Sequence, residues 1–310
     1  MFSGGGIGNW DMSKLLRFGE AFDGATAFNA DLSNWDISKV TAMQTAFRDS
    51  SFNQDISSLC TWGNKIQATA NVENMFTGTN CPLTANPDLE ASPKGPFCHV
   101  CLAPTNAPTK SPTETPSKIP SSIPSAAPTP VFGDKDALIA ALEQGDYSPT
   151  GPFGSIQSWN VQAVENFDSL ISGLTNVATF NGDVSMWDVS GVTSMSSVFL
   201  NAAAFNVPLN NWVVSSVTDL ASLFESSGFN SDLSNWDTSI VTSLIGTFKG
   251  TSFNGDISSW DTSRVNTMAE TFFGATSFNG DLSTWQTQSL TQMYGVFYGA
   301  TAFDGDLSGW

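Results

Sequence analysis

The stretch that decides the fold is Phe253-Asn254-Gly255-Asp256-Ile257-Ser258-Ser259-Trp260-Asp261-Thr262-Ser263-Arg264-Val265, because close copies of it recur along the chain. The tryptophans show the period. In the second half they are spaced 24 or 25 residues apart, at Trp187, Trp212, Trp236, Trp260, Trp285 and Trp310. Trp10 and Trp35 are again 25 residues apart. A fixed period of this length is typical of proteins built from stacked repeats, so we expect one unit to be repeated throughout.

Within the unit, large apolar residues keep the same offsets from the tryptophan, and two periodicities alternate. Residues 257–262 fit the strand entry of a leucine-rich repeat. Val265, Met268 and Phe272 follow at the i, i+3 and i+7 spacing of a short amphipathic helix. Residues 253–256 favour a turn, because Asn and Gly tolerate positive φ. The sequence therefore predicts an α/β solenoid with leucine-rich-repeat-like coils of about 25 residues, each a short strand, short helix and turn.

A single unit buries too little apolar surface to fold alone. Its large side chains cannot offset the conformational entropy that is lost when the whole unit becomes ordered. Stacking of neighbouring units has to supply the remaining burial and the hydrogen bonds between coils. We therefore expect each unit to pack on the next, and the array ends to need caps.

The units fall into two arrays. Residues 1–80 are expected to be the C-terminal part of a first array, followed by a cysteine-rich cap at 81–102 and a Pro/Ser/Thr linker at 103–130. An N-terminal capping helix is expected at 131–150, and a second array, truncated at its end, at 151–310. The truncations follow from the register, since the chain opens in the middle of a unit and closes where a new coil should begin.

Two boundary segments have distinct local patterns. Asp134 is a candidate N-cap before an amphipathic stretch that ends at Gly145, so a capping helix is predicted there. In the linker, proline occurs every four residues from Pro104 to Pro128, among Ser and Thr. Such a segment cannot pack a core and is expected to be extended polyproline II, either a bare spacer or an O-glycosylated stalk.

All four cysteines, Cys60, Cys81, Cys98 and Cys101, cluster near the end of the first array. An even number at one array end predicts a cap stapled by disulfides. Three connectivities are open, of which we favour Cys60–Cys81 with Cys98–Cys101. A four-thiolate zinc site is the rival, although only the last two cysteines have the usual spacing. The disulfide interpretation implies an oxidising, extracellular setting.

The composition excludes several classes of partner. The formal net charge is −18, and residues 131–310 contain 18 acidic but only three basic side chains. A surface this acidic repels phosphate, so nucleic acid and anionic lipid are not expected partners. No stretch approaches the roughly 20 apolar residues of a membrane span, so membrane insertion is not expected.

Catalysis has little support in the sequence. His99 is the only histidine and lies between two cysteines of the expected cap, so no Ser–His or Cys–His dyad fits the arrays. Each aspartate recurs at the same offset in several units, whereas a catalytic carboxylate pair is unique. The chain is therefore expected not to be an enzyme and to need no cofactor.

Two columns of aspartates are the main candidate sites. We expect both to accept backbone N–H groups in turns. One column follows the tryptophans, at Asp11, Asp36, Asp188, Asp237 and Asp261. The other lies in the turns, and a calcium ladder is the alternative for its members Asp183, Asp232, Asp256, Asp281 and Asp306. Pro208 replaces one rung of that ladder, which leaves a gap in it.

Other columns are assigned to structure rather than to binding. An internal hydrogen-bonding ladder is expected for Asn29, Asn53, Asn181, Asn206, Asn230, Asn254 and Asn279. The Trp and Phe columns are expected to be core rather than platforms that stack sugars. Thr238 and Thr262 have the spacing of a flat ice-binding face, but Ile37, Val189 and Val214 interrupt their column, so ice binding is not favoured.

The stretch 253–265 resembles the bacterial surface protein repeat, also called the BspA-like leucine-rich repeat surface protein family. That unit reads like F-N-x-D-I-S-x-W-D-T-S-x-V-T-x-M-x-x-M-F. The resemblance covers about residues 1–80 and 153–310, and the start of the second array is similar to family arrays of algal type. Known members are surface-exposed or secreted, with roles in adhesion and in host or matrix interaction. Pro208, Val213 and Gln286 replace the aspartates that are usual at these positions, which argues against a function that needs an aspartate in every unit.

These features predict a non-enzymatic extracellular or cell-surface protein with a structural or adhesive role, as part of a longer surface polymer or filament. The expected partners are neighbouring repeat chains or a matrix or cell-surface ligand, with head-to-tail self-assembly through the open array ends. The alternative is a calcium- or carbohydrate-dependent recognition module of a surface receptor. Its marker would be a non-repeating, exposed aromatic cluster on one face.

Overall fold

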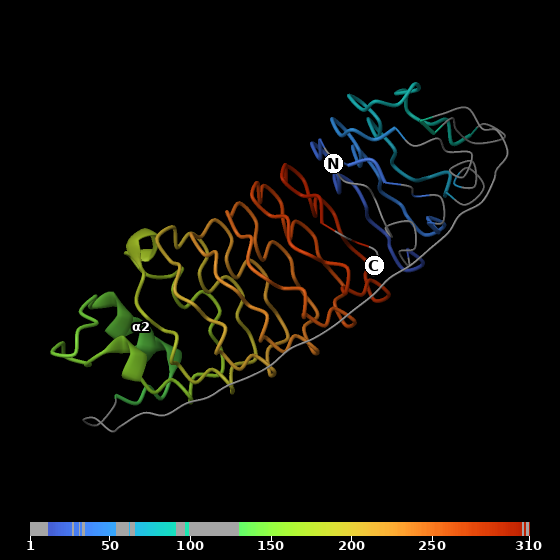
Figure 1. Ribbon diagram of the computed structural model, residues 1–310. Coiled ribbons are helices and arrows are strands. Elements are labelled where there is room, and N and C mark those ends of the chain that lie inside the picture. The colour runs from blue at the N-terminus through green and yellow to red at the C-terminus, as the bar shows by residue number, and fades with distance from the viewer. Residues whose placement is uncertain are drawn as a thin grey trace.

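The computed structural model describes residues 12–26, 28–30, 32, 35–53, 62, 66–90, 97–98, 130–305, 307 and 310. In these residues, segments about 25 positions apart lie side by side and form a row of coils (Figure 1). The helix α2 (Lys135–Glu143) lies at one end of the row, and two 3-10 turns follow it, η2 (Ile156–Ser158) and η3 (Val177–Thr179). Within the described residues, no helix has the length and apolar character to cross a membrane.

Neighbouring coils are joined by single parallel bridges and by the backbone hydrogen bonds around them. The bridges run in an unbroken series through Asn166, Ser194, Asp219, Ser243, Thr267, Gln292, Arg17, Ala42 and Asn71. Around each bridge, every second amide donates to the next coil. For example, the amides of residues 268, 270, 272 and 274 donate to the carbonyls of 292, 294, 296 and 298 at 2.6–2.9 Å. The backbone itself therefore specifies the register between units.

The segment expected to be a short helix is a series of turns. The amide of Thr271 donates to the carbonyl of Met268 at 3.1 Å, an i→i+3 bond. Because alternate amides here bond to the next coil, they are not available for the i→i+4 bonds of a helix. The expected strand also differs, since residues 257–262 contain a turn and the bridge lies at Thr267. Turns that recur every four residues place Met268 and Phe272 on one face, so their spacing imitates that of a helix.

Two positions in the coil have a left-handed backbone. They lie three and seven residues after the bridge, as at Glu270 (φ 58°) and Gly274 (φ 66°). Residues other than glycine occupy the first position in most coils, namely Glu20, Thr45, Asn74, Ser169, Ser197, Ser222 and Glu270. Such residues cost roughly 1–2 kcal/mol each. The hydrogen bonds between coils on both sides of these positions hold them in that conformation.

The tryptophan and phenylalanine columns form the core, which confirms the prediction from the sequence. Trp260 is buried and lies 6.0 Å from both Trp236 and Trp285 between ring centroids, within 5° of parallel. Its indole Nε1 donates to the carbonyl of Leu233 in the preceding coil at 3.1 Å. The same bond recurs at Trp187, Trp212, Trp236, Trp285 and Trp310. Stacking therefore satisfies the one polar atom of these six buried indoles.

The helix α2 covers the first coil of the second array. Asp134 is its N-cap, as predicted, and accepts a hydrogen bond from the amide of Ala137 at 2.8 Å. Its buried face consists of Leu138, Ala141 and Leu142. Lys135 Nζ donates to the backbone carbonyl of Asp168. In later coils, the carbonyl at the equivalent position accepts a hydrogen bond from an amide of the preceding coil. The helix thus closes the carbonyl edge of the row.

Residues 81–90, with Phe97 and Cys98, close the opposite end. In the last coil, the amide of Asn74 has no carbonyl of a following coil to donate to. It donates instead to the side-chain Oδ1 of Asn86 at 2.6 Å. Leu83 and Cys98 form an antiparallel bridge in the same segment. The cap at this end therefore supplies a side-chain acceptor for a backbone amide, whereas α2 supplies a side-chain donor for a backbone carbonyl at the other end.

The disulfide in this cap joins Cys81 to Cys98, so the connectivity favoured from the sequence is wrong. The antiparallel bridge at Leu83 folds the segment back on itself and brings these two cysteines together. Sequence spacing could not show this, because the segment lies outside the repeat. Cys60 and Cys101 lie outside the described residues.

The two arrays form one row, with the second array first. The amides of 293, 295, 297 and 299 donate to the carbonyls of 17, 19, 21 and 23 at 3.0–3.3 Å, and the amide of Leu16 donates back to the carbonyl of Thr291 at 3.0 Å. We call this contact the array junction. In Figure 1 the blue coils after residue 12 lie beside the red coils that approach residue 305. The array ends that the sequence suggested were open therefore lie on each other in one chain.

Candidate functional site

The aspartate columns are acceptors in turns, as the sequence suggested. In the turn column, Asp183, Asp232, Asp256 and Asp281 each accept from the amide two residues later at 2.8–3.1 Å. In the column after the tryptophans, Asp36, Asp188, Asp237 and Asp261 do the same at 2.9–3.1 Å. Asp11 and Asp306 lie outside the described residues. Each described carboxylate in these columns thus fixes the turn that carries it.

These bonds favour the ionised form of several carboxylates. The side-chain and backbone bonds from Ser190 lower the pKa of Asp188, and Gln162 adds to the effect. Burial raises the pKa of Asp183, but the bonds from Ser185 and Gln157 together outweigh it and the net shift is downward. Carboxylates held in this way are charged at neutral pH and are already solvated by protein donors.

The described residues contain no group of three or more His, Cys, Asp or Glu side chains arranged to hold a metal ion. Asp232 illustrates the competition that calcium would meet. One of its oxygens accepts from the amide of Ser234, and the other accepts from the Ser234 hydroxyl and from Asn210. An ion that bridges two coils would compete with such donors.

The asparagine column forms the predicted hydrogen-bonding ladder, but the ladder lies at the surface rather than in the interior, because Asn230, Asn254 and Asn279 are exposed. The amide of Asn254 donates to the side-chain Oδ1 of Asn230 at 2.7 Å, and Asn279 donates to Asn254 at 2.7 Å. The threonine column, in contrast, is internal. Thr238 and Thr262 are buried, and their hydroxyls donate to backbone carbonyls of the next coil. These two threonines therefore cannot form an exposed flat face.

One cleft lies where the repeat departs from its pattern. It has a volume of about 300 Å³ and is lined by Asn210, Asn211, Trp212, Val213, Val214, Asn235 and Asp237. Val213 stands where neighbouring coils have aspartate, and its side chain is 55% exposed. Asn210 donates to Asp232 at 3.1 Å and accepts from the amide of Asn235 at 2.8 Å. Amides, a carboxylate and apolar surface thus meet in one shallow depression.

An aromatic and charged cluster lies at the array junction. Burial, followed by a hydrogen bond with Glu20 of the first array, raises the pKa of Tyr294 to about 12. Nearby, Phe273 stacks on Tyr298 with ring centroids 4.4 Å apart, and Lys249 Nζ lies 5.3 Å from the Phe273 ring centroid. The cluster does not repeat, but its aromatic rings are partly covered by one another and by lysine. It therefore favours a contact between arrays over an open stacking platform.

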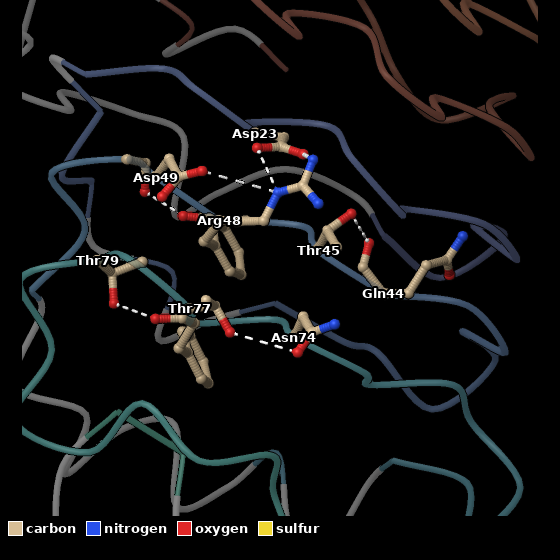
Figure 2. Close-up of polar contacts among 11 residues, drawn as sticks. Asp23, Gln44, Thr45, Arg48, Asp49, Asn74, Thr77 and Thr79 are labelled. Carbon is tan, nitrogen blue, oxygen red and sulfur yellow. Dashed lines mark hydrogen bonds and ion pairs between the residues drawn. The ribbon is translucent and has the colours of Figure 1, made fainter.

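A partly buried ion pair supports the first-array side of the junction (Figure 2). Arg48 Nε donates to Asp23 Oδ1 at 3.1 Å, and Nη2 pairs with the other carboxylate oxygen. The Asp23 side chain is only 3% exposed, whereas that of Arg48 is 36% exposed. Burial raises the pKa of Asp23, and the bond from Arg48 opposes the rise. The backbone carbonyl of Asp23 accepts the junction amide of Gly299 at 3.2 Å, so this pair steadies a contact residue.

Sequence reasoning missed the cleft and the junction cluster because it followed the columns that repeat. Both sites are marked instead by residues that depart from a repeating column. Val213 breaks the aspartate column, and two of the three tyrosines in the chain, Tyr294 and Tyr298, stand in a single coil. Rare residue types concentrated in one unit of a repeat indicate a local role.

Comparison with curated proteins and with solved structures finds no match. One family does match, over residues 1–85, 148–251 and 222–310, which are the segments that contain the 25-residue period. The matched segments exclude the linker and α2 and cover more than half of the chain. The chain belongs to this family, which is described as Mycoplasma protein of unknown function, DUF285.

Proposed function

We propose that this chain is a non-enzymatic structural or adhesive repeat protein of the cell surface or extracellular matrix. The observation that carries the proposal is the unbroken row of coils from Asn166 to Asn71, closed by α2 at one end and by the segment of Leu83, Asn86 and Cys98 at the other. We take this row to be a solenoid of leucine-rich-repeat-like coils, similar to BspA-like surface proteins. Its repeating side chains serve the row itself, which suits a scaffold better than a catalyst.

Adhesion would arise from repetition. Exposed serines and aspartates recur in successive coils, at the strand-like spacing of about 5 Å. A ligand with its own repeat, such as a matrix polymer or a neighbouring repeat chain, could contact several coils at once. Each contact can be weak, because the others keep the ligand near the surface.

An extracellular location is supported by the Cys81–Cys98 disulfide, since such bonds persist mainly in oxidising compartments. The net charge of −18 agrees with this role, because it disfavours nucleic acid and other polyanions as partners. Both features suit a protein that is exposed to solvent outside the cell.

The test is antibody binding to intact cells that produce the protein, with permeabilised cells as the reference. We expect equal signals in the two preparations, and we expect beads coated with the protein to adhere more strongly as coating density rises. A signal that appears only after permeabilisation would reject the surface location. Bead adhesion that is absent at every density would reject the adhesive role and leave the structural one.

A second candidate function is recognition of a neutral saccharide at the cleft near Val213. Amide groups, a carboxylate and apolar surface in one depression are typical of sites that bind sugars. Asn235→Ala should weaken saccharide binding at least about tenfold, the loss expected for a paired polar group. Met186→Ala is the control, because Met186 holds the same place before a tryptophan in another coil, outside the cleft. Equal binding by both variants would exclude this site.

A further inference from the structure

The array junction has two complementary edges. The first array presents carbonyls, at Arg17, Gly19, Ala21 and Asp23, and we call this the carbonyl edge. The second array presents amides, at Met293, Gly295, Phe297 and Gly299, which we call the amide edge. If the arrays separate, both edges lose their partners, and unpaired backbone edges are templates for association.

The junction has the same construction as a contact between consecutive units. A consecutive pair, residues 266–274 with 291–298, is joined by five backbone hydrogen bonds at 2.6–2.9 Å. The junction has the five equivalent bonds at 3.0–3.3 Å. The ring stack continues across it as well, with Phe22 and Phe297 centroids 5.9 Å apart, against 5.5 Å for Phe272 and Phe297. The coil that packs on the carbonyl edge comes from a distant part of the sequence. It nevertheless makes the same contacts as a consecutive unit would make.

Chain length permits the junction to form within one chain or between two. Eight steps separate the coil of Asn166 from that of Asn71, about 40 Å at the spacing of paired strands. The 28-residue linker at 103–130 can reach roughly 87 Å when it is extended. Closure within a chain is therefore within reach. Nothing in the edges themselves distinguishes the array of the same chain from that of a second copy.

We propose that the array junction is an exchangeable docking surface whose alternative occupant is a second copy of this chain. The amide edge of one copy docks on the carbonyl edge of another, and the contact is heterologous, so repetition of it builds rings or open head-to-tail assemblies. Dilution favours closure within the chain, and high concentration favours exchange. This deepens the proposed structural role, yet oligomerisation is measured on purified protein and does not depend on where the cell places it.

The test uses the full chain with the substitutions Leu16→Cys and Thr291→Cys. The backbone groups of these two residues are bonded across the junction, and the Leu16 side chain is partly exposed. After oxidation, closure within a chain gives a cross-linked monomer, whereas exchange gives a covalent ladder on a non-reducing gel. We expect mostly monomer in dilute solution and a ladder that grows with concentration. The unsubstituted chain, oxidised in parallel, controls for the native cysteines.

A shortened linker makes the test decisive. Deletion of residues 105–128 leaves about four linker residues, which reach roughly 12 Å and cannot span the row. This variant should give dimers and larger species only. Adding Leu16→Pro, which removes a junction N–H, should weaken its association about tenfold by sedimentation, while Leu16→Ala should not. A shortened chain that remains monomeric, or cysteine variants that never cross-link between chains at high concentration, would overturn the proposal.

Discussion

At the residue scale, backbone conformation determines the cost of a substitution. Gly274 has a φ of +66°, and a Cβ placed on it would meet nothing closer than 3.8 Å. The penalty for a side chain is therefore conformational, and Gly274→Ala should lower the free energy of unfolding by about 1–2 kcal/mol. Urea denaturation measures it. Gly133→Ala is the control, because Gly133 has no positive φ and no atom near its Cβ position. Equal losses in the two variants would refute the conformational explanation.

The Asp23–Arg48 pair gives a pH-dependent prediction. Arg48→Met leaves the buried carboxylate without its cation, so the pKa of Asp23, which burial already raises, should rise further. The unfolded carboxyl titrates near 3.8, and below that value Asp23 is protonated in both states. The loss of stability should therefore be small near pH 3 and grow as the pH rises. It should reach about 2–3 kcal/mol at pH 7, less than for a fully buried pair because Arg48 is partly exposed.

Urea unfolding at both pH values checks this prediction. The double variant Asp23→Asn with Arg48→Met has no buried charge, so it should recover most of the loss at pH 7. A loss that is the same at both pH values, or a double variant as unstable as the single one, would show that the guanidinium acts by packing alone.

The residue-scale features differ in how far the sequence predicts them. The turn bonds of Asp256 and the ladder of Asn254 could be predicted, because they follow from one residue type at one offset. The left-handed positions could not, since Glu270 and other polar residues take a conformation usually associated with glycine. The pairing of Asp23 with Arg48 joins neighbouring coils but does not recur in the other described coils, so no repeating column of residues indicates it.

At the scale of elements, α2 depends on its N-cap. Asp134 accepts from the amide of Ala137, so Asp134→Ala should lower the free energy of unfolding by about 1 kcal/mol. Asp136→Ala is the matched control, because Asp136 lies in the first turn but does not make the capping bond. It should cost only a few tenths of a kcal/mol through the helix dipole. Thermal unfolding of the two variants measures both losses. A larger loss of stability for the Asp136 variant would contradict the assignment of Asp134 as the N-cap.

The cap at the other end depends on its disulfide. The bond closes a loop of 17 residues, so replacing Cys81 and Cys98 together by serine should destabilise the cap by about 3 kcal/mol. The amide of Asn74, which donates to Asn86, should lose protection from hydrogen exchange first. Amides near Ser194, far along the row, should keep theirs. Unchanged protection at Asn74 would mean that the disulfide does not hold the cap.

The α2 helix was easier to predict than the elements inside the coils or the disulfide of the other cap. The α2 helix has a cap residue and an apolar face of its own, so local pattern is sufficient. Inside a coil, Met268 and Phe272 share a face through turns of four residues, and their spacing cannot be distinguished from that of a helix. The cap cysteines carry no period, so their pairing followed from the antiparallel bridge at Leu83 alone.

At the scale of the whole molecule, the sequence predicts the repeat but not the order of the arrays. Every unit presents carbonyls on one side and amides on the other, so the start of one array fits the end of any other. Stacking energy depends on these shared edges rather than on chain order. Only residues peculiar to the junction, such as Tyr294 and Glu20, mark the coil at which the two arrays meet.

The central claim is that both arrays form one row in dilute solution. Hydrogen exchange of the amide-edge residues Met293, Gly295, Phe297 and Gly299 tests it most directly, because their amides are bonded only across the junction. We expect protection within about tenfold of that of the equivalent amides of Met268, Glu270, Phe272 and Gly274, since both sets make the same bonds. Exchange of the amide edge at the rate of free peptide, while the second set remains protected, would contradict it.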